Sequence, residues 1–199
     1  MDNHYTLQSQ FYYRTGILVL GQLLLIISSF MWTDDGRYTV TGASFMFFSM
    51  LFWTIGFSEI FNHLKKQMPL YSRLGLIYAV YGSFGGLVFA LEGIFDDAAG
   101  QTQLGLKAAE QHAIIMNLVM YQSGPAFPLT LLIMAILLAV RKNISLISSL
   151  ILAAGAISFP LGRIVRISAV AHLSDVLILI GIVMVSYDLF KRGVRKEEL

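Results

Sequence analysis

The fold is decided most clearly by residues 153–188, which read AAGAISFPLGRIVRISAVAHLSDVLILIGIVMVSYD. Two long apolar runs in this stretch are separated by Arg163 and Arg166, and the second run carries His172 and Asp175. An apolar run of about 20 residues is long enough to cross the hydrocarbon core of a bilayer as an α-helix. The stretch therefore predicts two membrane-spanning helices joined by a short turn that holds two arginines.

The composition of the whole chain supports a lipid environment. Of its 199 residues, 56% are hydrophobic and only 13% are charged, and the mean hydropathy is +0.69. Soluble domains average about a quarter charged residues, so we expect a lipid bilayer around this chain. The net charge of +2 comes from bases at the helix ends, which membrane topology explains better than nucleic-acid binding. Without cysteine, disulfides, thiolate metal ligands, iron–sulfur clusters and dithiol relays are excluded.

The apolar pattern predicts an all-α, polytopic membrane protein with one transmembrane domain, residues 1–199. The expected spans cover residues 15–32, 40–64, 71–95, 112–140, 144–161 and 167–190. The first run follows a polar, aromatic start and lacks a small-residue cleavage pattern, so we expect it to be retained as a span. The polar interval 96–111 contains enough Ala and Leu for a short surface helix.

The fourth span is interrupted by the sequence Ser-Gly-Pro-Ala-Phe-Pro at residues 123–128. Each proline removes a backbone hydrogen bond and pushes against the preceding turn, which predicts a kink or break at Gly124–Pro128. Interrupted spans line the solute sites of some transporters, although most such interruptions are plain bends. In the third span, Gly82, Gly85 and Gly86 form a small-residue face of the kind that lets helices pack closely.

Six spans place both termini on one side of the membrane. Basic residues gather on that side, at Arg14, between residues 65 and 73, at residues 141–142 and in the tail. The positive-inside rule therefore predicts that both termini are cytoplasmic and that the protein lies in the cell (plasma) membrane. The opposite, outer side keeps two acidic pairs, Arg37, Lys107 and the two arginines Arg163 and Arg166.

In this topology, polar side chains of several spans gather towards the outer half of the membrane. The candidate ligand-binding residues are Glu92, Asn117, Gln122, Arg163, Arg166, His172 and Asp175. A pair of guanidinium groups can bind carboxylate or phosphate in a bidentate manner, which makes Arg163 and Arg166 a candidate anion site if the turn stays helical. The alternative is that the two arginines reach the lipid headgroups or pair with nearby acids.

His172 and Asp175 are three residues apart and share a helix face. They are candidates for a proton relay, for a metal site, or for haem ligation with His112 as the second axial ligand. No single-segment motif such as His-Glu-x-x-His supports a metal site. The alternative for the histidines is an interhelical hydrogen bond that fixes helix packing. A carboxylate as deep as Asp175 is costly without a partner, and this favours a functional role.

These features favour a small transporter or channel-like protein with an outer-half site for a small ion or an anionic solute, with a homo-oligomer as one possible assembly. A haem- or metal-binding redox protein is the first alternative, and a non-catalytic accessory subunit is the second. No predicted span contains lysine, which argues against a retinal Schiff base. The sequence holds no nucleophile elbow, phosphate-binding loop or dinucleotide fingerprint, and it therefore gives no specific indication of an enzyme.

Overall fold

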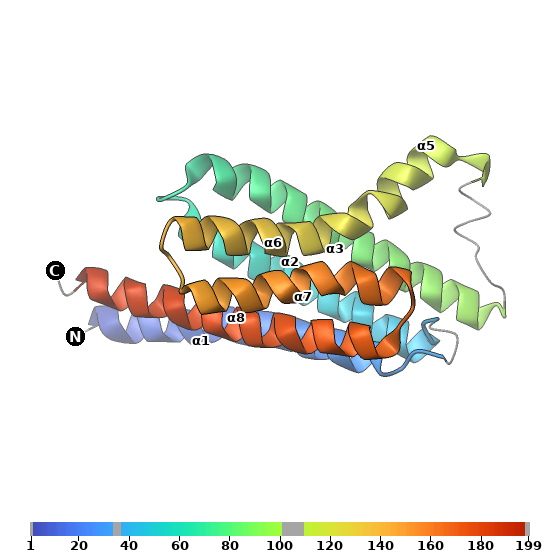
Figure 1. Ribbon diagram of the computed structural model, residues 1–199, viewed down its shortest axis with the longest axis horizontal. Coiled ribbons are helices and arrows are strands. Elements are labelled where there is room, and N and C mark those ends of the chain that lie inside the picture. Colours follow the sequence, from blue (N-terminus) through green and yellow to red (C-terminus); the bar gives the residue numbers. More distant parts are fainter. Residues whose placement is uncertain (1, 34–36, 101–109, 198–199) are drawn as a thin grey trace.

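The computed structural model describes residues 2–33, 37–100 and 110–197, and Figure 1 shows them as a bundle of long helices. Six helical segments of this part of the chain are long and apolar enough to cross a membrane. The described residues also contain one isolated antiparallel bridge, between Trp32 and Tyr38 in the first connection. The predicted all-α fold with six spans is therefore confirmed.

In chain order, the helical elements of the described residues are α1 (Asp2–Ser29), α2 (Val40–Leu64), α3 (Pro69–Ala98), α5 (Ala113–Met116), η1 (Asn117–Tyr121), α6 (Ser123–Val140), α7 (Leu146–Ile164) and α8 (Ser168–Glu197). The fourth span consists of α5, η1 and α6. The surface helix predicted within residues 96–111 falls mostly on 101–109, which lie outside the described residues, as do Lys107 and the acidic pair at 34 and 35.

The six spans form a closed ring. Going round it, α1 packs on α2, α2 on α3, α3 on α6, α6 on α7, α7 on α8, and α8 returns to α1. Aromatic side chains fill the interior: Trp53 and Phe57 of α2 are fully buried, and both rings meet Phe127 of α6 edge-on, with centroids 5.0 and 5.9 Å apart. The first and last spans are therefore neighbours although they lie at opposite ends of the sequence.

Small residues set the close approach of α3 and α6, as predicted. A Cβ atom added to Gly82 would lie 2.7 Å from the Cα of Phe127. At Gly85 it would lie 2.6 Å from the Cβ of Ser123, also on the fourth span. Real Cβ atoms do not approach other atoms so closely, and only glycine therefore fits at these two positions of the α3 face.

The predicted kink of the fourth span is present, and its most distorted part lies just before Gly124–Pro128. Residues 117–121 form a π-helical turn, in which the backbone N–H of Gln122 donates to the carbonyl of Asn117, five residues earlier, at 2.9 Å. The ring of Pro125 pushes on the carbonyl four residues before it, at Tyr121, where the widened turn ends. Pro128 stays inside α6. Figure 1 shows α5 turning away from the axis of α6.

The fifth helix is longer than predicted. It continues to Ile164 with Pro160 inside it, whereas the sequence suggested an end near residue 161. Membrane helices tolerate an internal proline because neighbouring groups compensate for the lost hydrogen bond. The extension places Arg163 in the last helical turn and so fixes the direction of its side chain.

Figure 1 shows both chain termini at the same end of the bundle, which we call the terminal end. The α2–α3 and α6–α7 connections lie at this end as well. The opposite, distal end carries the α1–α2 connection and the α7–α8 turn. The residues of the 163–166 turn therefore lie at the distal end.

Candidate functional site

A buried ion pair joins α7 to α8 near the distal end. The Nη2 atom of Arg163 donates to both carboxylate oxygens of Asp175, at 3.0 and 3.1 Å. The side chain of Asp175 is completely buried, and that of Arg163 is 14% exposed. Asp175 lies seven residues beyond the start of α8 at Ser168, a depth of about 10 Å at the helical rise. The arginine thus points back from the end of α7 into the bundle.

The two helices lie close enough for this pair because α7 presents glycine to α8. A Cβ atom on Gly162 would lie 2.7 Å from the Cα of Ala171. A second contact of this kind occurs deeper in the bundle, where a Cβ on Gly155 would lie 2.8 Å from the backbone nitrogen of Ile178. The ion pair is therefore built on a closely packed helix pair.

Aromatic rings line the space around the guanidinium group. The Cζ atom of Arg163 lies 3.7 Å from the ring centroid of Phe159 and 5.9 Å from that of Trp32. Aromatic faces attract a cation, but they accept few hydrogen bonds. The removal of a charge from water costs several kcal/mol unless its hydrogen-bonding capacity is met. In these surroundings, Asp175 accepts hydrogen bonds from Nη2 of Arg163. This uses only part of the hydrogen-bonding capacity of the guanidinium group.

Three N–H donors at this place are buried without a well-formed hydrogen bond to a described residue, and the phenol oxygen of Tyr38 is the acceptor that lies near Arg163 and Trp32. The three donors are Nε and Nη1 of Arg163 and Nε1 of Trp32. Buried N–H groups in proteins nearly always have a partner. The site thus has a local excess of donors beside a positive charge, and this combination suits an anion or another electron-rich acceptor.

Tyr38 belongs to the same group of side chains. Its ring meets the ring of Trp32 edge-on, with centroids 5.4 Å apart. Burial raises the pKa of the Tyr38 phenol above its ordinary value of 10.0, and the positive charge of Arg163 opposes only part of this rise. The phenol is therefore neutral at physiological pH, and its oxygen lies where it can accept a hydrogen bond from Arg163 or Trp32.

The first helix supports the site from the other side. Nε2 of Gln22 donates to the backbone carbonyl of Asp175 at 2.9 Å, and Gln22 is completely buried. One turn before Asp175, the Nδ1 atom of His172 lies 3.0 Å from Oγ of Ser29. The ring of Phe30 stacks on His172 at 3.9 Å. These contacts join α8 to the end of the first span. They match the alternative expected for His172, a hydrogen bond between helices that fixes their packing.

Arg166 does not form a fork with Arg163. The α7 helix ends at Ile164, and Arg166 has a left-handed backbone with φ = 57°. The N–H of Ile167 donates to the carbonyl of Gly162 at 2.9 Å, which is the long hydrogen bond of a Schellman helix end. The condition that the turn stays helical is therefore not met: Arg163 points into the bundle, and Arg166 is exposed.

The other candidate residues lie on a different part of the ring. Asn117 and Gln122 are exposed on the bent part of the fourth span, and Glu92 is half-buried on α3. The π-helical turn packs on α3 and α6, whereas α8 packs on α1 and α7. The structure thus brings Arg163, His172 and Asp175 together and leaves Asn117 and Gln122 outside the group, whereas Glu92 is next to Gly93, which packs against Tyr38.

The two histidines predicted as metal or haem ligands are also apart. His112 is exposed at the start of α5, and Figure 1 shows α5 on the side of the bundle away from α8. Residues 2–33, 37–100 and 110–197 contain no group of three or more His, Asp or Glu side chains that could hold a metal ion.

Three members of the site were not singled out from the sequence: Ser29, Trp32 and Tyr38. All three flank the short connection after the first span, and no spacing rule links that connection to residues 163–175. The sequence provides one indirect indication of partner residues: a carboxylate as deep in the membrane as Asp175 is costly without a partner.

Comparison with protein-family models, with curated proteins and with solved structures found no match to this chain. The function is therefore inferred from the residues of the site.

Proposed function

We propose that this protein is a small transporter or channel-like protein that binds a small anion or an anionic solute beside Arg163. The observation that carries the proposal is the excess of buried donors at the Arg163–Asp175 pair. A bound anion would accept hydrogen bonds from Nε and Nη1 of Arg163 and from Nε1 of Trp32. These are the charge-assisted bonds by which arginine recognises carboxylate and phosphate oxygens.

In this proposal, the protonation or the hydrogen-bond partner of Asp175 changes when the anion binds. A bound anion competes with the carboxylate of Asp175 for the one guanidinium group. The carboxylate is completely buried, and a buried charge without a partner is strongly disfavoured. Asp175 would then take up a proton or change its hydrogen-bond partner as the anion binds, which would couple anion movement to proton movement.

In this proposal, the bent fourth span is the part of the protein that moves during transport. The π-helical turn of residues 117–121 and Pro125 leave the backbone less regular there than in the other spans. Such turns are frequent at functional sites. The aromatic interior formed by Trp53, Phe57 and Phe127 would have to separate for a solute to pass, and a hinge between α5 and α6 would permit this.

The proposed orientation follows from charge. Lys65 and Lys66 at the α2–α3 connection, and Arg141 and Lys142 at the α6–α7 connection, lie at the terminal end of the bundle. By the positive-inside rule this end faces the cytoplasm. We therefore place both termini in the cytoplasm, the Arg163 site in the outer half, and the protein in the cell membrane.

The test is a flux assay in proteoliposomes that carry an internal pH-sensitive dye. Chloride, inorganic phosphate and small carboxylates would be supplied outside in turn, and anion uptake and proton movement would be followed together. We expect uptake of at least one of these anions by the wild-type protein. Asp175→Asn should uncouple or abolish the accompanying proton movement, and Arg163→Gln should abolish uptake.

Two further variants keep the test decisive. Arg37→Gln removes the same charge at an exposed position of the distal end, and it should leave uptake unchanged. Arg163→Lys keeps a charge beside Asp175 but loses the planar donor pattern, and it should weaken uptake without preventing folding. The proposal is wrong if folded wild-type protein moves none of these anions, or if Arg163→Lys and Asp175→Asn behave like wild type.

A further inference from the structure

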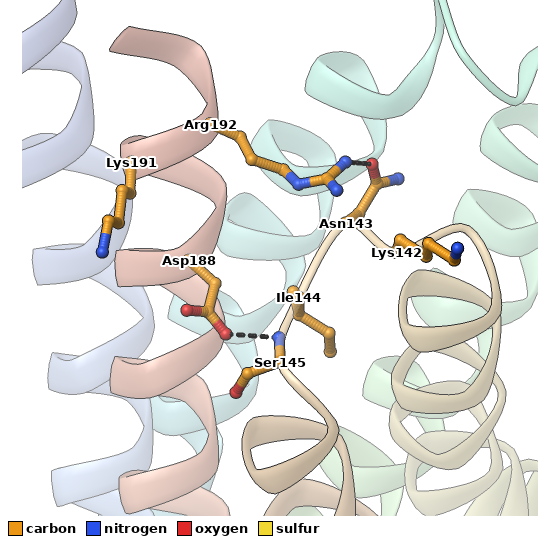
Figure 2. A pocket seen from close by; sticks show the side chains of 7 residues that line it. All are labelled: Lys142, Asn143, Ile144, Ser145, Asp188, Lys191 and Arg192. Atoms are coloured by element: carbon orange, nitrogen blue, oxygen red, sulfur yellow. Dashed lines mark hydrogen bonds between the residues drawn. The ribbon is translucent and has the colours of Figure 1, made fainter. Parts of the chain in front are cut away.

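A polar hollow lies at the terminal end, far along α8 from the Arg163 site. It has a volume of about 240 Å³ and lies where the last part of α8 meets the α6–α7 connection. Its lining residues are Lys142, Asn143, Ile144, Ser145, Asp188, Lys191 and Arg192. Figure 2 shows their side chains. Three of the seven are cationic, and one is acidic.

The acidic residue, Asp188, uses its carboxylate in hydrogen bonds that stabilise the start of α7. Oδ2 of Asp188 accepts hydrogen bonds from the backbone N–H of Ser145 at 2.7 Å and from Oγ of Ser148 at 2.7 Å. It thereby caps the start of α7 together with the hydroxyl of Ser145. Carboxylates are favoured at helix N-termini because they meet the exposed N–H groups. Among the residues that line the hollow, the three cations therefore outnumber the one carboxylate.

Arg192 is held in place over the hollow. Its Nη1 atom donates to Oδ1 of Asn143 at 2.8 Å, and Asn143 is only 4% exposed. Figure 2 shows Arg192 reaching across from α8 to the connection, whereas the side chains of Lys142 and Lys191 extend away from it in opposite directions. The contact orients the guanidinium group, but an amide oxygen leaves its positive charge unneutralised.

The position of the hollow suits one kind of ligand. It lies at the ends of α6, α7 and α8, and its cations come from two separate parts of the chain. Basic pockets between transmembrane helices on the cytoplasmic side bind the headgroups of anionic lipids. A phosphate oxygen is also the acceptor that arginine and lysine together bind best.

We propose that this hollow is a binding site for the phosphate group of an anionic lipid headgroup, with Arg192 as the central cation and Lys142 and Lys191 as flanking cations. The chemistry that it recognises, a phosphate anion, is shared by lipid headgroups and by free inorganic phosphate. The site is separate from the proposed anion site at Arg163, and it does not depend on the transport function.

The experiment is native mass spectrometry of the full chain in detergent micelles. The protein is titrated in parallel with phosphatidylglycerol, with phosphatidylcholine and with inorganic phosphate. We expect one retained phosphatidylglycerol per chain at concentrations where phosphatidylcholine is not retained. Because each basic residue near an anionic surface contributes about 1 kcal/mol, or roughly a fivefold change in binding, Arg192→Gln should weaken this binding about fivefold.

The double variant Lys142→Gln/Lys191→Gln should weaken it by more than tenfold, and it leaves the Arg192–Asn143 hydrogen bond in place. Arg73→Gln is the matched control, since Arg73 is exposed at the terminal end but does not line the hollow. Retention of phosphate and not of the lipid would assign the site to a free anion. The proposal is overturned if neither probe is retained, or if Arg73→Gln weakens binding as much as Arg192→Gln.

Discussion

Gln22 and Asp175 are 153 positions apart, and the side-chain amide of the first donates to the backbone carbonyl of the second at 2.9 Å. The same aspartate holds Arg163 through its carboxylate. One residue of α8 thus connects the first, fifth and sixth spans of the ring. Because all of these groups are buried, the closure of the ring and the proposed anion site depend on the same contacts.

Asp175→Asn should destabilise the fold strongly, because it leaves the charge of Arg163 buried without a counter-charge. The loss of one partner of a buried pair costs about 3–5 kcal/mol, and replacement of both partners costs much less. We therefore expect Asp175→Asn to unfold at a lower denaturant concentration than wild type in mixed micelles. The double variant Arg163→Gln/Asp175→Asn should recover part of this lost stability.

The control for this cycle is the Arg14–Glu59 pair, whose atoms lie 3.0 Å apart but whose side chains are 29% and 28% exposed. Exposed pairs contribute about 0–1 kcal/mol, so Glu59→Gln should have a small effect. Equal losses for Glu59→Gln and Asp175→Asn would contradict the assignment of Asp175 as the partner of a buried charge.

Gln22→Leu should lower stability by about 1 kcal/mol, the usual contribution of an interhelical hydrogen bond in a membrane protein. The same substitution at Gln122, which is exposed on the bent span, should be neutral because leucine suits a lipid-facing position. Both values can be read from the unfolding transitions of the purified variants. A neutral Gln22→Leu would mean that α1 and α8 are held by apolar packing alone.

Gly82→Ala should loosen the contact between α3 and α6. The new methyl group would meet the backbone of Ala126 and Phe127 at 2.7 Å, and overpacking of this kind costs about 1–3 kcal/mol. Gly16→Ala is the comparison, because a Cβ at Gly16 meets nothing within 4 Å. We expect a lower melting temperature for Gly82→Ala only, measured by the loss of circular dichroism on heating.

The buried phenol of Tyr38 should make stability fall at high pH. Its pKa in the folded protein is raised above the ordinary 10.0 by burial, so the folded state holds this proton more tightly than the unfolded state does. The contribution is fully present below pH 10 and is lost as pH rises through the raised pKa. Wild type should therefore lose stability more steeply above pH 10 than Tyr38→Phe does. Parallel curves for the two proteins would show that Tyr38 ionises freely.

Apolar run lengths alone predicted the six spans, because a helix must hide its backbone polar groups in lipid and this requires about 20 apolar residues. Local residue patterns also predicted the glycine face of α3 and the kink at Gly124–Pro128. Each is a local property: the residue types within one or two turns are enough to impose it.

The partners within the site were decided by tertiary structure. Arg163 and Arg166 have the same chemistry, but the helix end at Ile164 directs one to Asp175 and leaves the other exposed. Trp32 and Tyr38 join them because the ring closes between α1 and α8. The sequence determined that Asp175 needs a partner in the membrane. Which residue that partner is depends on which helices are neighbours, and neighbouring helices are selected by side-chain packing between segments distant in the chain.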